Sequence, residues 1–146
     1  LIGLQPRGAF LCKRVLKKLN FLLPTIDIKS GNLDISFYRD DLMRRDHPIE
    51  PDIMDINLSF EDKNIILVDD VLFTGRSIRS ALDAILSFGR PKTVELLTLI
   101  NRRFSRHLPI EPTYVGKTID ALSEEKVIVE WKEVHGVDRV LMKKNT

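Results

Sequence analysis

The chain has 146 residues, of which 43% are hydrophobic and 30% charged, so it can form one domain with a buried core. No apolar run approaches the roughly 20 residues of a membrane-spanning helix. The single cysteine, Cys12, excludes an intrachain disulfide, and we expect a reducing, cytoplasmic setting. A net charge of +2 is too small to identify a nucleic-acid partner on its own.

The first third of the chain predicts a strand, a loop and a helix. Residues 1–4 are apolar and resemble the end of a strand; since no methionine precedes them, we expect a missing N-terminal segment. Residues 5–8 predict a loop, and residues 9–19 a helix with apolar positions on one stripe and lysines outside.

The middle of the chain is less regular. Residues 30–32 predict a turn and residues 33–38 an alternating strand. Residues 39–51 are charged, contain two prolines and predict an exposed loop. Residues 53–60 are ambiguous and could hold a short strand.

The strongest pattern is a strand, a helix and a second strand at residues 65–68, 77–88 and 94–100. A crossover helix between two buried strands predicts a parallel sheet and an α/β fold. Shorter strands are expected at residues 114–115, 127–134 and 139–142.

The first of these strands runs into two acids and a hydroxyl-rich turn. Asp69 and Asp70 should lie at its carboxyl end, where open parallel sheets bind ligands. Thr74, Gly75 and Ser77 then begin a helix, whose free N–H groups favour a phosphate. Carboxylates repel phosphate but suit a diol or a divalent cation, so the pair of features fits a ribose 5-phosphate.

Each feature alone has a simpler explanation. Paired acids after a strand are often solvated, and a Thr-Gly turn is often only a helix cap. The stretch is neither GxGxxG nor GxxxxGK[ST], which excludes the common dinucleotide and P-loop motifs. A phosphorelay receiver also has paired acids at strand ends but does not need the Thr-Gly-Arg-Ser turn. The combination is therefore the informative signal.

The stretch IILVDDVLFTGRS resembles the phosphoribosyl pyrophosphate signature of type I phosphoribosyltransferases. GLQPRGAFLCKRV resembles the pyrophosphate loop of that family, and GNLDISFYRDDL the start of its mobile hood. FGRP, RHLPIEPTYVGK and EEKVIVEWKEVHGVDRV are similar to the family branch of pyrimidine operon attenuation regulators. The resemblance implies one phosphoribosyltransferase domain over residues 1–146, incomplete at its N-terminus, with a central parallel sheet, flanking helices and a small hood.

The resemblance also implies roles for individual residues. The ribose 5-phosphate and its diol would be held by Asp69, Asp70, Thr74, Gly75, Arg76 and Ser77. Pyrophosphate would be bound by Arg7, Gly8 and Arg39, and the base by Val115, Gly116 and Lys117. Arg39, Asp70 and Arg7 would be catalytic, and Asp69 and Asp70 would hold Mg²⁺ through water.

The implied reaction converts uracil and 5-phosphoribosyl-1-pyrophosphate to UMP and pyrophosphate. The implied second role is regulation by binding messenger RNA leaders, for which Arg102, Arg103 and Arg106 are the candidate residues. We also expect a homo-oligomer, a dimer or larger, and no membrane partner. A salvage transferase for a purine or another base, without an RNA role, is the alternative.

The chain departs from the family pattern in three places. Asn101 replaces the aspartate of a DRG motif, and this amide would weaken a second magnesium contact. TIDALSEE stands where Pro-Thr-Ser is expected after Lys117, near the base. Glu111 replaces an arginine and opposes RNA binding locally.

Overall fold

The structure is a computed structural model that describes residues 1–35 and 59–144. Its elements, in chain order, are β1 (Ile2–Leu4), α1 (Arg7–Leu22), β2 (Gly31–Leu33), β3 (Asn64–Leu72), α2 (Arg76–Ser87), β4 (Thr93–Arg103), β5 (Tyr114–Asp120), β6 (Glu125–Glu130), α3 (Lys132–His135) and β7 (Arg139–Lys144). No helix in the described part of the chain is long and apolar enough to cross a membrane.

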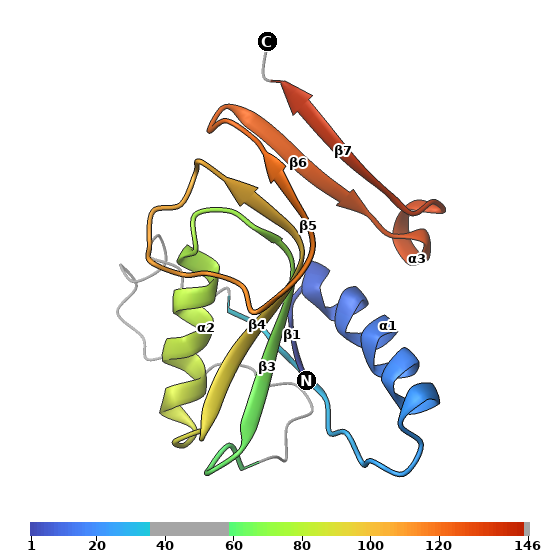
Figure 1. Cartoon of the computed structure of the whole chain (residues 1–146), viewed down its shortest axis with the longest axis vertical. Helices are drawn as coiled ribbons and strands as arrows, with labels where there is room; N and C mark the ends of the chain where they lie inside the picture. The colour runs from blue at the N-terminus through green and yellow to red at the C-terminus, as the bar shows by residue number, and fades with distance from the viewer. Residues whose placement is uncertain (36–58, 145–146) are drawn as a thin grey trace.

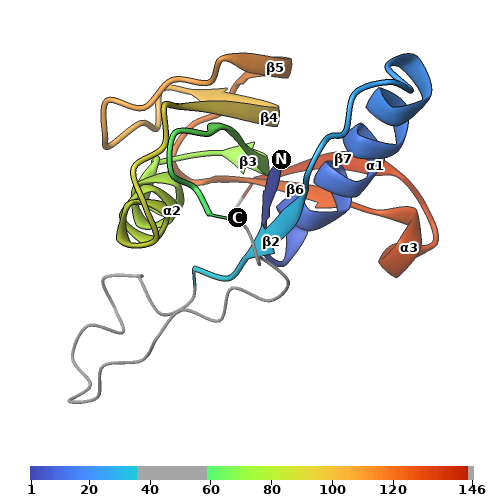
Figure 2. The same cartoon turned by 90° about the horizontal axis from the view of Figure 1, so that it is seen from below.

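Five parallel strands form the central sheet in the order β2-β1-β3-β4-β5. Helix α1 connects β1 to β2 and lies on one face, whereas α2 connects β3 to β4 and lies on the other (Figures 1 and 2). The chain therefore moves outward in opposite directions from β1 and from β3. Such a change of direction leaves a crevice beyond the carboxyl ends of the two strands.

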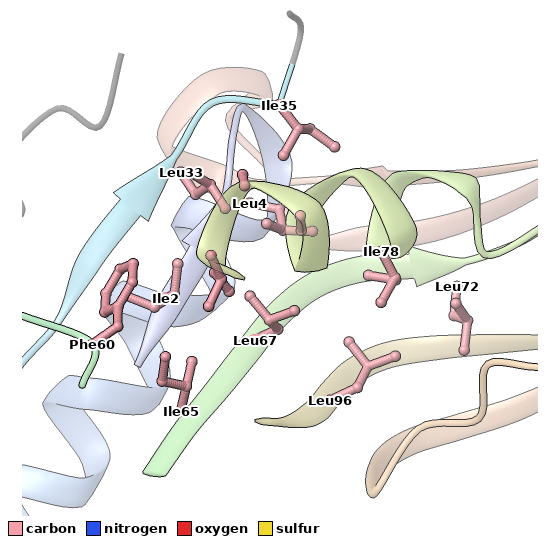
Figure 3. Close-up of a cluster of buried hydrophobic side chains, with 13 residues drawn as sticks. Ile2, Leu4, Leu33, Ile35, Phe60, Ile65, Leu67, Leu72, Ile78 and Leu96 are labelled. Carbon is pink, nitrogen blue, oxygen red and sulfur yellow. The ribbon is translucent and has the colours of Figure 1, made fainter. Parts of the chain in front are cut away.

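The core is divided between the two faces of the sheet. Strand β3 contributes to both, because alternate residues of a strand point to opposite faces. Ile65 and Leu67 pack toward α2, together with Ile2, Leu33 and Phe60 (Figure 3). Val68 instead joins a cluster with α1 and β6 that contains Leu11, Cys12, Val127, Val129 and Trp131. Cys12 is thus a core residue.

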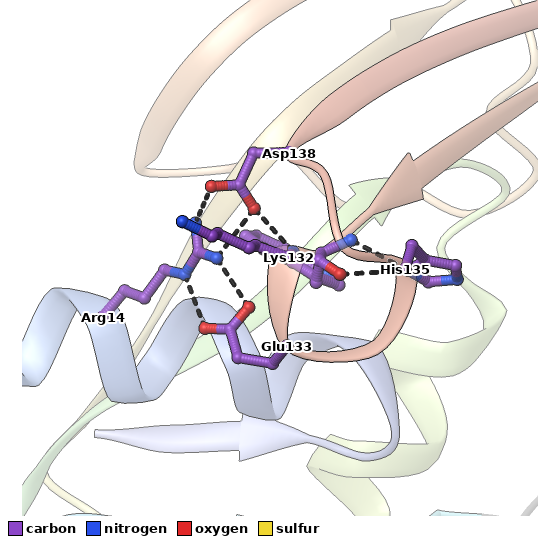
Figure 4. Close-up of polar contacts among 6 residues, drawn as sticks. Arg14, Lys132, Glu133, His135 and Asp138 are labelled. Atoms are coloured by element: carbon purple, nitrogen blue, oxygen red, sulfur yellow. Dashed lines mark hydrogen bonds and ion pairs between the residues drawn. The ribbon is translucent and has the colours of Figure 1, made fainter.

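The C-terminal hairpin, β6 with β7, forms a separate antiparallel pair. Arg14 on α1 holds it in place, with both oxygens of Glu133 and both of Asp138 accepting hydrogen bonds from its guanidinium at 2.6–3.0 Å (Figure 4). The same guanidinium lies over the ring of Trp131, 4.9 Å from its centroid. All the carboxylate oxygens of this cluster therefore have a partner.

The expected α/β fold is confirmed, but several element bounds differ. Residues 30–32 do not form a turn: Gly31 already begins β2, which pairs with β1. Residues 127–134 are not one strand, because β6 ends at Glu130 and α3 follows Trp131. Strands β3, β4 and β5 are all longer than expected, since each continues as long as its neighbour supplies hydrogen-bond partners. The loop expected at residues 39–51 lies outside the described residues.

Candidate functional site

The crevice between β1 and β3 contains the two acids. Strand β1 pairs with β3 only as far as Val68 and ends at Leu4, whereas β3 continues to Leu72 beside β4. Asp69 and Asp70 therefore lie inside β3 and not at its end, which corrects the prediction. They still lie beyond the end of β1, and both line a cavity of about 760 Å³.

Burial makes this carboxylate pair costly to ionise. It is the main factor that raises the pKa of Asp69 to about 7, and the charge of Asp70 adds to it. Burial also raises the pKa of Asp70, while the Arg7 guanidinium opposes that rise. The backbone N–H of Val71 donates to Oδ1 of Asp70 at 2.8 Å, but the buried Oδ2 has no partner among the described residues. An unpaired buried carboxylate oxygen in a cavity indicates a binding site for a hydroxyl or a cation.

A second cavity, of about 440 Å³, adjoins the first and contains the turn after β3. Thr74, Gly75, Arg76 and Ser77 all line it, as predicted, and Asp69 lines both cavities. Gly75 has φ of +91°, a left-handed conformation that strains other residues. Gly75, which precedes α2, has no side chain to cap the helix, and the N–H of Arg76 donates to Oγ1 of Thr74 at 3.3 Å. The N-terminus of α2 and its dipole lie at this cavity, which makes it an anion site.

The loop after β1 brings Pro6 and Arg7 to the opposite wall of the larger cavity. Gly8, the second residue of α1, lies directly against β3. A Cβ on Gly8 would lie 2.3 Å from the carbonyl oxygen of Val68, so only glycine fits there. This close approach places Arg7 beside the acids.

The third wall comes from the end of β4. Arg102 is only 4% exposed and lines the larger cavity. Its guanidinium carbon lies 3.8 Å from the ring centroid of Phe73, and Nη2 donates to the carbonyl oxygen of Leu122 at 2.7 Å. Burial lowers the pKa of Arg102, and its Nε has no partner among the described residues.

The segment between β4 and β5 is hydrogen-bonded to the turn after β3 that contains Thr74 and Gly75, which we call the phosphate turn. Arg106 donates from Nη1 to the carbonyl oxygen of Phe73 and from Nη2 to Oδ1 of Asn101, both at 2.6 Å. The N–H groups of His107 and Leu108 both point to the carbonyl oxygen of Thr74. Asn101 thus supports the turn through Arg106, where the family pattern has a carboxylate.

These contacts correct the expectation of one arginine surface. Arg102 is buried in the cavity wall, and Arg106 is occupied by backbone and side-chain acceptors. Of these three arginines only Arg103 is well exposed. It forms an ion pair with Asp120 and lies over the ring of Phe104. Phe104 itself is 69% exposed and has φ of +70°.

The predicted base-binding residues are not brought to the crevice. Val115, Gly116 and Lys117 lie on β5, the exposed edge of the sheet, and line neither cavity. The wall on that side is formed by Lys126 and Val127 of β6 instead. Arg39, the predicted hood residue, lies outside the described residues.

Sequence reasoning missed Phe73, Lys126 and the cavity role of Arg102. Phe73 stands within the acid–phosphate motif, and an aromatic spacer there was a usable signal. Nothing local marked Lys126, because only the return of the chain through β6 brings it to the cavity.

The donor set fits a magnesium ion only in part. Asp69 and Asp70 offer oxygens, including the unpaired Oδ2. Within the described residues, however, no group of three or more His, Cys, Asp or Glu side chains could hold a metal. Mg²⁺ prefers six oxygen ligands, so water and ligand oxygens would have to complete its coordination.

Comparison with known proteins agrees with this geometry. Residues 1–134 match the phosphoribosyl transferase domain family. The chain is 43% identical over 144 residues to the bifunctional protein PyrR of Enterococcus faecalis, covering 99% of this chain and 79% of the relative. It is 49% identical to that of Endomicrobium trichonymphae, covering 96% and 79%.

Solved structures support the fold. The hypoxanthine phosphoribosyltransferase of Trypanosoma cruzi has a TM-score of 0.69 at 16% identity, covering 99% of this chain and 75% of that one. The Staphylococcus aureus enzyme of the same name has a TM-score of 0.68 at 21% identity, covering 99% and 74%. Since family and fold agree, the chain belongs to the phosphoribosyl transferase domain family and, within it, to the bifunctional PyrR proteins.

Proposed function

We propose that this phosphoribosyltransferase transfers the phosphoribosyl group from 5-phosphoribosyl-1-pyrophosphate to uracil and also binds pyrimidine operon leader RNA to attenuate transcription. The supporting observation is the pair of adjoining cavities that share Asp69. One has the N-terminus of helix α2 and the other has a carboxylate pair facing an arginine. A 5-phosphate, a ribose diol and a pyrophosphate require these three groups in this order.

The mechanism needs no covalent nucleophile from the protein. The 5-phosphate binds at the first turn of α2, and Asp69 and Asp70 accept hydrogen bonds from the ribose hydroxyls. As the bond between C1 and pyrophosphate breaks, positive charge develops on the sugar ring, as in glycoside cleavage. The acids lie near that charge, and Arg7 lies near the leaving pyrophosphate.

Magnesium, when bound by Asp69 and Asp70 directly or through water, would neutralise negative charge on pyrophosphate. Arg39 would add a second cation by closing over the leaving group. Closure would also exclude water, which otherwise hydrolyses the activated sugar.

The direct test is nucleotide formation with a panel of bases. Purified protein with 5-phosphoribosyl-1-pyrophosphate and Mg²⁺ should make UMP from uracil much faster than it converts cytosine, hypoxanthine or guanine. Preference for a purine would support the salvage alternative. Absence of any nucleotide product would refute the proposed activity.

The RNA role is supported by an exposed pair on the segment between β4 and β5. Phe104 presents its ring to solvent beside the guanidinium of Arg103, 5.3 Å from the ring centroid. Unpaired RNA bases stack on such aromatic and arginine surfaces, and arginine also contacts phosphates. This pair therefore replaces the three-arginine surface as the candidate RNA contact.

Gel-shift and calorimetric titrations with leader RNA at several salt concentrations would test this role. Arg103→Ala should weaken binding and make the slope of log affinity against log salt shallower by about 0.7 to 0.9, the value for one phosphate. Phe104→Ala should weaken binding without changing the slope. Arg79→Ala, on the exposed face of α2, is the matched control.

UMP and RNA should each increase the affinity of the protein for the other by the same factor. If the protein does not bind leader RNA, only the enzymatic role remains.

A further inference from the structure

Arg102 is a buried cation without an anionic partner. Within residues 1–35 and 59–144 no carboxylate lies within ion-pair distance, although Glu125 is close enough to influence its pKa. Two of its interactions, with Phe73 and with Leu122, fix the guanidinium plane. Burying such a charge with an idle donor is costly, so the fold keeps it for a reason other than stability.

The position of Arg102 in the crevice identifies the ligand group that it faces. Arg7 follows β1, the acids belong to β3 and Arg102 is the penultimate residue of β4, so the three lie in this order across the sheet. The sugar is held in the middle by the acids, and pyrophosphate leaves on the Arg7 side. The incoming base attacks C1 from the face opposite the leaving group, which is the side of Arg102.

We infer that Arg102 is a catalytic residue whose guanidinium donates a hydrogen bond to a carbonyl oxygen of the pyrimidine and stabilises the base as its anion. This role rests on the proposed uracil transfer. Uracil releases its N1 proton to water, the N1 electron pair forms the bond to C1, and the electron pair of the broken C1–O bond leaves with pyrophosphate. In the uracil anion, the negative charge on N1 is delocalised over the ring and shared with the carbonyl oxygens. A fixed cation has its largest effect beside those oxygens.

The other charges around the base do not provide this contact. The charged residues lining the same cavity are Arg7, Asp34, Asp69, Asp70 and Lys126. Arg7 and the acids are used by pyrophosphate and ribose, and Lys126 is exposed. Glu125 accepts a hydrogen bond from the N–H of Leu122 at 2.9 Å, which holds the same loop that Arg102 contacts. Arg102 is therefore the rigid, desolvated donor on the base side.

The test compares uracil with 5-fluorouracil, whose N1 proton is more acidic because fluorine withdraws electrons. Arg102→Met should lower kcat/KM for uracil by about 10- to 100-fold, the usual value of a hydrogen bond to a charged group. The loss with 5-fluorouracil should be several-fold smaller, since its anion needs less stabilisation. Arg102→Lys, which keeps a charge without the planar guanidinium, should lie between, and Arg79→Met should match wild type.

The outcomes separate the two levels of the proposal. If wild-type protein makes no nucleotide from either base, the proposed function fails. If it makes both, and Arg102→Met loses the same factor with both or loses nothing, Arg102 is structural and the inference fails. If the variants do not fold, the test uses the wild-type protein. The ionisation of 5-fluorouracil is then followed by ¹⁹F NMR in the presence of protein, ribose 5-phosphate and Mg²⁺. The bound base must ionise at a lower pH than the free base. An unchanged ionisation midpoint would overturn the role of Arg102.

Discussion

The crevice at β1 and β3 and the contact between α1 and the C-terminal hairpin both contain charged side chains, but they differ in how those charges are paired. At the hairpin, Arg14 donates to all four oxygens of Glu133 and Asp138. In the crevice, Asp70 Oδ2 and Arg102 Nε are buried without a partner in the described part of the chain.

The difference separates a structural cluster from a binding site. Paired charges gain little from a ligand, whereas buried charged groups without a partner lose free energy until a ligand supplies one. Removing a charge should therefore weaken folding at the hairpin and weaken function in the crevice.

The largest effect is expected for Asp70→Asn. The amide keeps the shape but removes the charge facing the sugar, so the transfer rate should fall by about 100- to 1000-fold. Because ionising buried Asp70 is unfavourable, thermal stability at neutral pH should be unchanged or higher. Asp83→Asn on the exposed surface of α2 is the control. Normal UMP synthesis by the Asp70 variant would refute the site assignment.

A smaller effect on turnover is expected for Arg39→Ala. Its proposed partner, pyrophosphate, gains charge as it leaves, so kcat should fall by about 10- to 100-fold with little change in UMP binding or stability. Steady-state kinetics and a UMP titration would measure this. If only KM rises, Arg39 contacts the substrate in its ground state, and the proposed role in stabilising the leaving pyrophosphate is wrong.

Arg14→Ala should show the opposite pattern. Loss of two exposed carboxylate pairs and the contact with Trp131 should lower the free energy of unfolding. Calorimetry should show a lower Tm than for the wild-type protein. Arg79→Ala, with one pair at 3.9 Å, should change Tm far less. If Arg14→Ala abolished transfer while Tm stayed constant, the distinction between the two regions would not hold.

The smallest expected effect concerns the pH dependence of stability without ligands. The pKa of Asp69 is about 7 in the fold against an ordinary 3.8, so the folded state binds more protons between these values. Its contribution to the free energy of unfolding is fully present below about pH 4 and declines as pH rises to 7. Asp69→Asn should flatten this part of the profile in denaturant titrations. An unchanged slope would show that the acids are not buried as described.

The sequence predicted the phosphate side of the site because all its parts lie within residues 65–77. The strand, the acids and the turn are local patterns with known geometry. Arg102 was misassigned to a surface because a run of charged residues carries no information on burial. β4 extends through Arg102 only because β5 continues beside it.

The base side depended on contacts distant in sequence. The segment containing Gly116 was expected there, but the pairing of β5 with β4 makes it a sheet edge. A Cβ on Gly116 would lie 2.6 Å from the carbonyl oxygen of Leu99, which explains a glycine there by packing alone. Lys126 could be placed only from the tertiary path of β6.

The hydrogen bonds from Arg106, His107 and Leu108 to the phosphate turn also make this protein suitable as an optical sensor. The exposed residue 104 lies in the segment that these hydrogen bonds connect to the turn, about 30 positions later in the chain. A fluorophore attached to a cysteine at that position would change its emission when nucleotide binds. The buried Cys12 would stay unlabelled, so one substitution would be enough to build the sensor.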